Sequence, residues 1–178
     1  DRPESSATPP ATAAPRPPIR LLIVAPAAFK DALADYVAWR GTTRPTAFVT
    51  LEEILKKTEG ADDPETLKRF LYDWHLHQGL GYVLLVGDAD VMPVRYMVLD
   101  RVTSQAFDYA FYPSDLYYAD VAKADGSFED WNGRKDGFHA GYFGEVRGEK
   151  QKEDPINFDG IDYVPELAVG RWPVSTPE

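Results

Sequence analysis

Cysteine is absent from this chain of 178 residues. Its absence excludes internal disulfide bonds, thiolate metal ligands and a thiol nucleophile supplied by these residues. A catalytic Cys–His pair therefore cannot be built from the chain itself. The absence does not assign a compartment, because a secreted protein can also do without disulfide bonds.

Positive charge is scarce as well, since 19 Lys and Arg residues stand against 29 Asp and Glu residues, for a net charge of −10. Neutralising the phosphates of a nucleic acid requires clustered basic side chains, so the composition argues against a nucleic-acid partner. The acidic excess is compatible with cation binding or with solubility. No apolar run approaches the roughly 20 residues needed to span a bilayer, and no transmembrane segment is predicted.

Apolar residues make up 44% of the chain and aromatic residues 13%, which is enough for a packed core. Residues 1–18 are rich in Pro, Ala, Ser and Thr and are predicted to form a disordered linker. We expect an α/β subdomain over residues 19–99 and the beginning of a second, incomplete subdomain over 100–178. The chain starts with Asp1 and stops soon after a strand-like segment, so we expect a processed product or a fragment.

Strand-length apolar runs alternate with segments of helical spacing in the first half of the chain. Strands are expected at residues 19–25, 46–51 and 82–86, and helices at 29–39, 51–57 and from 62 or 63 to about 78. Further strands are expected at 94–99 and 167–170. Continuous apolar strands joined by helices predict βαβ units, and hence an α/β fold with a mostly parallel sheet in a three-layer αβα arrangement.

Three motifs place acidic residues at or beside these strands. They read YVLLVGDAD at 82–90, YPSDLYYAD at 112–120 and PELAVGR at 165–171. In open α/β sheets, ligands bind beyond the carboxyl ends of the strands, so Asp88 and Asp90 are candidate site residues. The alternative, which spacing alone favours, is that one of them caps a turn through its side chain.

Asp115 follows Ser114 in an aromatic setting formed by Phe111, Tyr112, Tyr117 and Tyr118. A carboxylate in such a setting can accept a hydrogen bond from an imidazole and stabilise the imidazolium formed during catalysis. The alternative is a carboxylate that satisfies backbone amides of its own loop.

Oxygen-donor side chains gather in one irregular stretch downstream of that motif, where calcium is the predicted ion because it accepts hard ligands on flexible loops. The candidate ligands are Asp120, Asp125, Asp130, Asn132, Asp136 and Glu145. The segment from Asp130 starts like an EF-hand loop, but its glycine comes two residues too late for that motif. A solvated acidic loop is the alternative.

The chain has three histidines, and they form no catalytic arrangement in the sequence. His75 and His77 are two residues apart on a predicted helix, so they point to different faces and cannot clamp one metal ion together. His139 lies in a Gly-rich stretch, where a catalytic role stays open. A Ser–His–Asp triad is unsupported, because the chain has no Gly-x-Ser-x-Gly motif.

In their order, the three motifs resemble the gingipain-type cysteine peptidases, a family with a caspase-like fold, and the resemblance extends from Ile19 to Ser175. It implies a caspase-like α/β domain that cleaves peptide bonds with a Cys nucleophile and a His base. It further implies calcium as a stabilising ion and an extracellular or cell-surface location. Asp115 matches the family's Asp that supports the His.

In that family the His and the Cys follow the strand that reads AVGR at 168–171 here. We therefore expect the N-terminal part of a cysteine endopeptidase, truncated before both residues and inactive alone. Its partners would be protein or peptide substrates and the remainder of the peptidase domain. A non-catalytic calcium-binding or adhesion module on the same fold is the alternative, and a receiver- or flavodoxin-like domain is a weaker one.

Overall fold

A computed structural model describes residues 19–98, 111–131, 142–143 and 160–177 of the chain. The predicted linker at 1–18 and the predicted boundary between residues 99 and 100 lie outside this part. So do His139 and three candidate calcium ligands, namely Asn132, Asp136 and Glu145.

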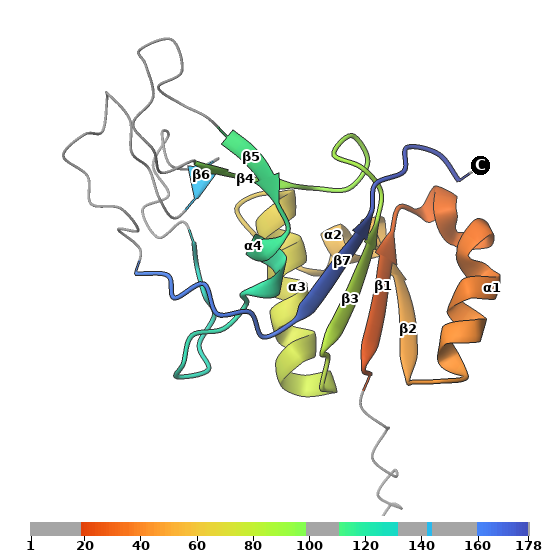
Figure 1. The fold of residues 1–178 in the computed structure, drawn as a ribbon, viewed down its shortest axis with the longest axis horizontal. Coiled ribbons are helices and arrows are strands. Elements are labelled where there is room, and N and C mark those ends of the chain that lie inside the picture. Colours follow the sequence, from red (N-terminus) through yellow and green to blue (C-terminus); the bar gives the residue numbers. More distant parts are fainter. Residues whose placement is uncertain (1–18, 99–110, 132–141, 144–159, 178) are drawn as a thin grey trace, which may run out of the picture.

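The main sheet of the described part has four parallel strands in the order β2-β1-β3-β7 (Figure 1). The strands are β1 (Leu21–Ala25), β2 (Thr46–Thr50), β3 (Tyr82–Val86) and β7 (Ala168–Trp172). Every residue of β1 is buried, since β1 has strands on both sides and helices on both faces. The β1–β2 pairing begins with Leu21 opposite Thr46, and the β3–β7 pairing with Tyr82 opposite Ala168.

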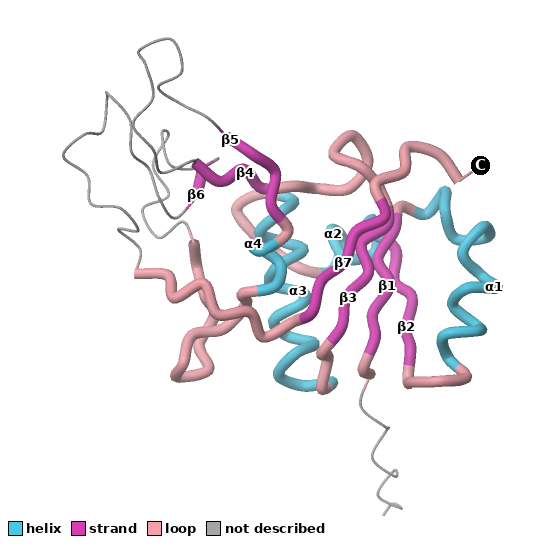
Figure 2. The backbone as a smooth tube through the Cα atoms, viewed as in Figure 1, coloured by secondary structure: helices cyan, strands magenta, loops and turns pink. Residues whose placement is uncertain are grey.

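Helices cover the two faces of this sheet (Figure 2). On one face lie the short 3-10 helix η1 (Ala27–Phe29) and α1 (Lys30–Gly41), whose Phe29 and Leu33 pack against Leu21, Ile23 and Val86. On the other face lie α2 (Leu51–Lys57) and α3 (Asp63–Gln78). Ile54, Leu67 and Leu71 from these two helices join Leu22, Val24 and Leu85 in the larger core. The predicted three-layer αβα fold is thus confirmed.

The ends of α3 follow directly from the sequence. Asp62 caps its first turn, because its Oδ1 accepts a hydrogen bond from the backbone N–H of Glu65 at 3.0 Å, and Pro64 stands in that turn. Gly79 ends the helix in the left-handed conformation, with φ of 68°. These signals return the chain to the sheet at β3.

A smaller unit lies beside the main sheet, on the side away from α1 (Figure 1). Its strands are β4 (Arg95–Val98), β5 (Phe111–Ser114) and β6 (Tyr142–Phe143), with β4 between an antiparallel β5 and a parallel β6. Helix α4 (Leu116–Ala119) follows β5 after one residue, Asp115. The sequence predicted a strand near β4, but its pairing with β5 and β6 is a tertiary choice.

The main sheet draws on both predicted subdomains, because β7 belongs to the second and pairs with β3 of the first. Within the described residues, none of the helices has the length and apolar character needed to cross a membrane.

Candidate functional site

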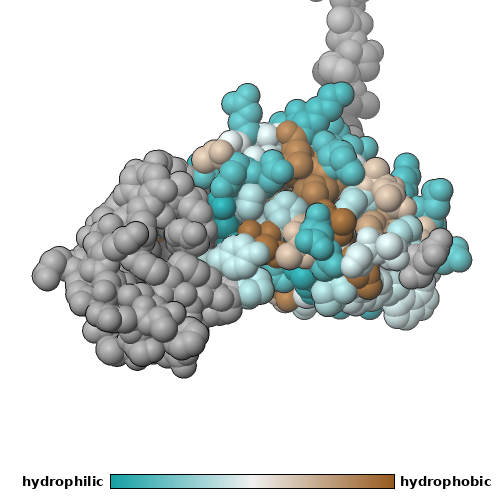
Figure 3. All heavy atoms as spheres, turned by 90° about the horizontal axis from the view of Figure 1, so that it is seen from above, coloured by the Kyte–Doolittle hydropathy of each residue, from teal (hydrophilic) through white to brown (hydrophobic). Residues whose placement is uncertain are grey.

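The carboxyl ends of the parallel strands meet at one edge of the main sheet. Here the loop after β3 and the segment after β7 run together, with Gly87 N–H donating to the Trp172 carbonyl at 2.9 Å. Apolar residues form a band between hydrophilic ones on this side of the molecule (Figure 3). This edge is where ligands of open α/β folds bind.

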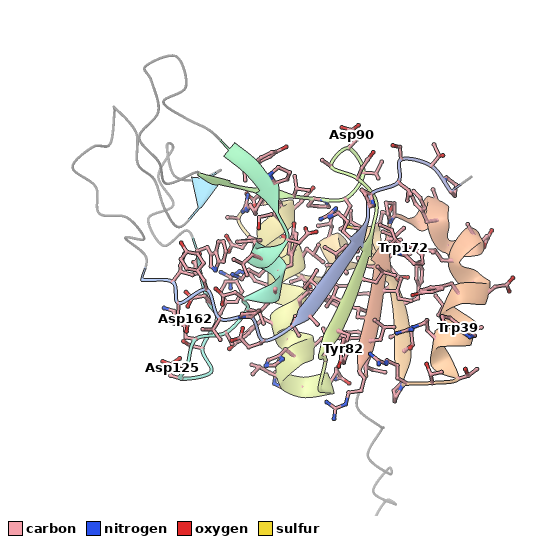
Figure 4. The ribbon with its side chains drawn as sticks, in the orientation of Figure 1. Trp39, Tyr82, Asp90, Asp125, Asp162 and Trp172 are labelled. Atoms are coloured by element: carbon pink, nitrogen blue, oxygen red, sulfur yellow. The ribbon has the colours of Figure 1, made fainter. Side chains whose placement is uncertain are left out.

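Asp88 and Asp90 build the loop after β3. The Oδ1 of Asp88 accepts a hydrogen bond from the backbone N–H of Asp90 at 3.2 Å, and its Oδ2 accepts one from the hydroxyl of Ser175. Asp88 therefore caps its turn, as spacing favoured, and also joins the loop to the segment after β7. Asp90 is exposed at the tip of the loop (Figure 4).

Asp115 lies close to this edge in a two-bond ion pair with Arg171 of β7. Arg171 donates from Nε to Oδ2 at 2.8 Å and from Nη2 to Oδ1 at 2.7 Å. The same guanidinium donates to the carbonyls of Gly87 at 2.9 Å and Pro93 at 3.1 Å. One side chain thus connects the β5–α4 junction with the ends of β3 and β7 and holds the Asp115 carboxylate in one orientation.

A cleft of about 400 Å³ opens next to the loop after β3. It lies between that loop and the starts of α2 and α3, and its lining includes Leu51, Met92 and Tyr96. Asp63 and Asp90 add two carboxylates to the lining. This is a mostly apolar cleft with two acids in its lining, beside the carboxyl edge of the sheet.

A second cluster of acids lies away from this edge, on the side of the molecule opposite α1. Asp120, Glu129 and Asp162 each place a carboxylate oxygen within 4.8 Å of the other two. Asp120 follows α4, and Glu129 is brought back to it by a hairpin in which Glu129 N–H donates to the Val121 carbonyl at 3.0 Å. Asp162 arrives from the segment before β7 and is exposed (Figure 4).

Two of these carboxylates are buried with unsatisfied oxygens. Asp120 is 0% exposed and Glu129 2% exposed. The indole N–H of Trp131 donates to Asp120 Oδ2 at 2.9 Å, but within the described residues neither Asp120 Oδ1 nor Glu129 Oε1 has a hydrogen-bond partner. Burial raises the pKa of Asp120 to about 6 against the opposing charge of Lys68, and burial also raises the pKa of Glu129.

This donor set fits a hard divalent cation. Calcium binds carboxylate oxygens in variable geometry, and it would supply the positive charge that the two orphaned oxygens require. Of the ligands predicted from the sequence, Asp120 belongs to the cluster. Asp125 and Asp130 are not members of it.

Asp125 instead stabilises its own turn through hydrogen bonds. Its Oδ1 accepts hydrogen bonds from the backbone N–H and the hydroxyl of Ser127, at 2.9 and 2.6 Å, and these bonds lower the pKa of Asp125. Sequence reasoning missed Glu129 and Asp162. Glu129 stands in the same acidic stretch as the predicted Asp125 and Asp130 and could have been included with them. Nothing local, however, indicates that Asp162 comes back to Asp120 across 42 residues.

His75 and His77 stay near the end of α3, as predicted. The Nδ1 of His75 lies 3.2 Å from the Leu80 carbonyl oxygen, and the Nδ1 of His77 lies 3.1 Å from a carboxylate oxygen of Asp73. Both imidazoles are engaged locally, and neither is part of the acidic cluster.

The chain was compared with curated proteins, solved structures and protein families. A search of curated proteins gave no match. A solved structure titled "Structure of Protease" matches with a TM-score of 0.50 at 22% sequence identity, covering 90% of this chain and 25% of that one, so the chain spans a quarter of its length. At this identity the likeness shows a shared fold. Because a family model described as Peptidase family C25, the gingipain family, matches residues 14–178, the chain belongs to this peptidase family.

Proposed function

We propose that the chain is the N-terminal part of a gingipain-like cysteine endopeptidase that hydrolyses peptide bonds, and that it is inactive alone. The family match over residues 14–178 carries this proposal. Inactivity is supported by the composition, because a chain without Cys cannot supply the thiolate nucleophile. The nucleophile and the His would come from the remainder of the peptidase domain.

In this proposal Asp115 orients the His that the remainder supplies. The supporting observation is the fixed position of its carboxylate, which Arg171 holds by two hydrogen bonds near the carboxyl ends of β3 and β7. A carboxylate oxygen has two lone pairs, so Asp115 retains acceptor capacity beside the guanidinium. It would accept a hydrogen bond from the Nδ1–H of the imidazole and stabilise the imidazolium during acyl transfer.

The proposed docking place of the remainder is the edge of the main sheet at β7. In the described part of the chain, β7 pairs on one side only, and its residues alternate between exposed and half-buried. Trp172 at its end is 40% exposed and packs against Tyr36 in a tilted arrangement, with 4.7 Å between ring centroids. An unpaired strand with exposed apolar side chains favours further pairing, so we expect this chain to aggregate when produced alone.

The test compares this chain with the longer protein encoded by the same gene. We expect the chain to be silent in a peptide-hydrolysis assay, and the longer protein to be active and labelled by a thiol-alkylating reagent. Asp115→Asn in the longer protein should reduce kcat by about 100-fold or more with thiol labelling retained. A longer protein without any Cys, or one that hydrolyses peptides after complete alkylation, would exclude the cysteine-peptidase proposal.

We also propose that Asp120, Glu129 and Asp162 bind a structural calcium ion. Binding to the native state alone should raise the unfolding temperature when calcium is added. Asp120→Asn should remove most of that shift, whereas Asp125→Asn, a matched change outside the cluster, should leave it. No shift at about millimolar calcium, the range of extracellular sites, would contradict the proposal. A site of such affinity would suit the extracellular or cell-surface location that we propose for the protein.

The second candidate function is a non-catalytic calcium-binding or adhesion module. The acidic cluster, together with the missing cysteine, favours it. The two functions separate in the experiment on the longer protein, since the module predicts calcium-dependent stability without any peptide hydrolysis.

A further inference from the structure

Lys68 of α3 is a buried cation next to the acidic cluster, and its side chain is 0% exposed. Its ammonium lies over three aromatic rings, at 4.4 Å from the centroid of Tyr117, 5.0 Å from Trp131 and 5.6 Å from Phe128. Such a cage attracts a cation and keeps it away from water. Within the part of the chain that the structure describes, Lys68 Nζ makes no hydrogen bond.

Nearby carboxylates favour the protonated, charged form of Lys68. Burial lowers the pKa of Lys68 to about 7, and the negative charges that oppose this are, in order of effect, those of Asp120, Glu129, Asp130 and Glu166. Two of these four are members of the acidic cluster. The ammonium and the cluster are therefore one buried group of charges.

Three atoms of this group have no hydrogen-bond partner among the described residues, namely Lys68 Nζ, Asp120 Oδ1 and Glu129 Oε1. A divalent ion seated among the carboxylates would satisfy the two oxygens but would be repelled by the ammonium. The ammonium is 0% exposed among the aromatic rings, so in its protonated form it repels an ion bound by the same carboxylates. The charges of three carboxylates and one ammonium sum to −2, which a single divalent cation neutralises.

We propose that Lys68 is the resident counter-ion of the Asp120–Glu129–Asp162 site, holding the carboxylates together without metal and lowering the site's affinity for calcium. This inference rests on the calcium site proposed above. Lys68 is then an affinity-determining residue: it keeps the smaller unit folded when calcium is scarce, and it confines binding to high calcium concentrations.

The experiment measures calcium affinity by titration calorimetry and the unfolding temperature in chelator. It uses the longer protein encoded by the same gene, as wild type and as Lys68→Met. Methionine has a similar length and packs well against aromatic rings. We expect Lys68→Met to bind calcium about tenfold more tightly or better, because a cation close to the bound ion is removed. In chelator its unfolding temperature should fall below that of the wild type, and added calcium should recover it.

The matched control is Lys57→Met, which removes the same charge from an exposed position at the end of α2. It should leave affinity and unfolding temperature unchanged. If Lys68→Met does not fold in chelator, the double variant Lys68→Met with Asp120→Asn should fold there, because it also removes one carboxylate. A double variant as unstable as Lys68→Met would assign Lys68 a packing role only and overturn the proposal.

The two proposals fail in different ways. Equal calcium affinities of the wild type and Lys68→Met would overturn the role of Lys68 and leave the calcium site standing. If neither protein binds calcium, the calcium site and the role of Lys68 in it both fall.

Discussion

The main sheet and the smaller unit beside it are stabilised by different kinds of contact. The main sheet is apolar, and its central strand β1 is buried at every residue. The smaller unit adds apolar side chains such as Tyr118 and Trp131 to the same core, but it also buries charges, with Lys68, Asp120 and Glu129 all at most 2% exposed where it meets α3. Apolar burial is non-directional, whereas buried charges need partners in defined positions. Contacts of the second kind therefore depend far more on how the whole chain is arranged.

Two arginine–carboxylate pairs fasten the smaller unit to the rest. Arg95 of β4 donates to both carboxylate oxygens of Asp62, at 2.7 and 2.6 Å, and so joins the smaller sheet to the start of α3. Arg171 does the same for Asp115 and the main sheet. If the two regions are stabilised in these different ways, substitutions of buried apolar residues should destabilise the whole molecule. Substitutions of the charged residues should destabilise mainly the smaller unit.

The largest effect is expected from a cavity in the main sheet. Leu22→Ala in β1 should reduce the free energy of unfolding by about 2–5 kcal/mol, since the side chain is fully buried. The measurement is urea unfolding of the longer protein followed by circular dichroism, with Leu76→Ala, on an exposed side chain of α3, as the control. A loss confined to the smaller unit would refute the assignment of the global core to this sheet.

The next effect concerns Arg171, whose loss should open the smaller unit locally. Arg171→Met should cost about 2–3 kcal/mol, because it leaves the Asp115 carboxylate and the Gly87 carbonyl without this donor, whereas the Pro93 carbonyl keeps the Tyr118 hydroxyl. Hydrogen exchange should show faster exchange in α4 while β1 and β3 stay protected. Arg171→Lys should recover part of the loss only, since an ammonium cannot make the two parallel bonds. Equal loss of protection in β1 would contradict a local role.

Asp62→Asn tests the ion pair between Asp62 and Arg95, and the expected loss in the free energy of unfolding is smaller. Asn still caps α3 but removes the charge that Arg95 faces, so we expect a loss of about 1 kcal/mol, because Asp62 is partly screened by solvent. Asp62→Ala removes the cap as well and should cost about 1 kcal/mol more. If the two variants are equally stable, the cap contributes nothing measurable.

The smallest effect on stability at neutral pH is expected from the ionisation of two buried tyrosines, which matters only at high pH. Burial raises the pKa of Tyr117 and of Tyr118 above the ordinary value near 10. A group whose pKa is higher in the folded than in the unfolded state makes its full contribution to the free energy of unfolding at any pH below the pKa of the unfolded state. That contribution is lost as the pH rises further. The free energy of unfolding should fall above about pH 10, and tyrosinate absorbance should show these two rings ionising with unfolding. Phenylalanine at both positions should flatten this decline.

Local patterns were sufficient for most of the main sheet. The strand at 82–86 and the helix at 51–57 match β3 and α2 residue for residue, because apolar periodicity and capping signals act over a few neighbours. The start of α3 was predicted at residue 62 or 63 for the same reason, and Asp62 caps the helix there. Asp115 and Asp120 were singled out from the sequence, but their contacts were not.

The sequence by itself determined the α/β architecture, the acidic character and the absence of a thiol nucleophile, since these depend on composition and on spacing between near neighbours. Only the tertiary structure decided that Arg171 grips Asp115 from 56 residues away, that Asp162 joins Asp120 and Glu129, and that Lys68 is buried beside them. A charged side chain on a helix is ordinarily exposed, and it becomes buried only where distant segments bring aromatic rings and carboxylates around it. No local sequence pattern predicts the burial of this lysine, because the energy of a buried charge depends on groups that only the folded chain places next to it.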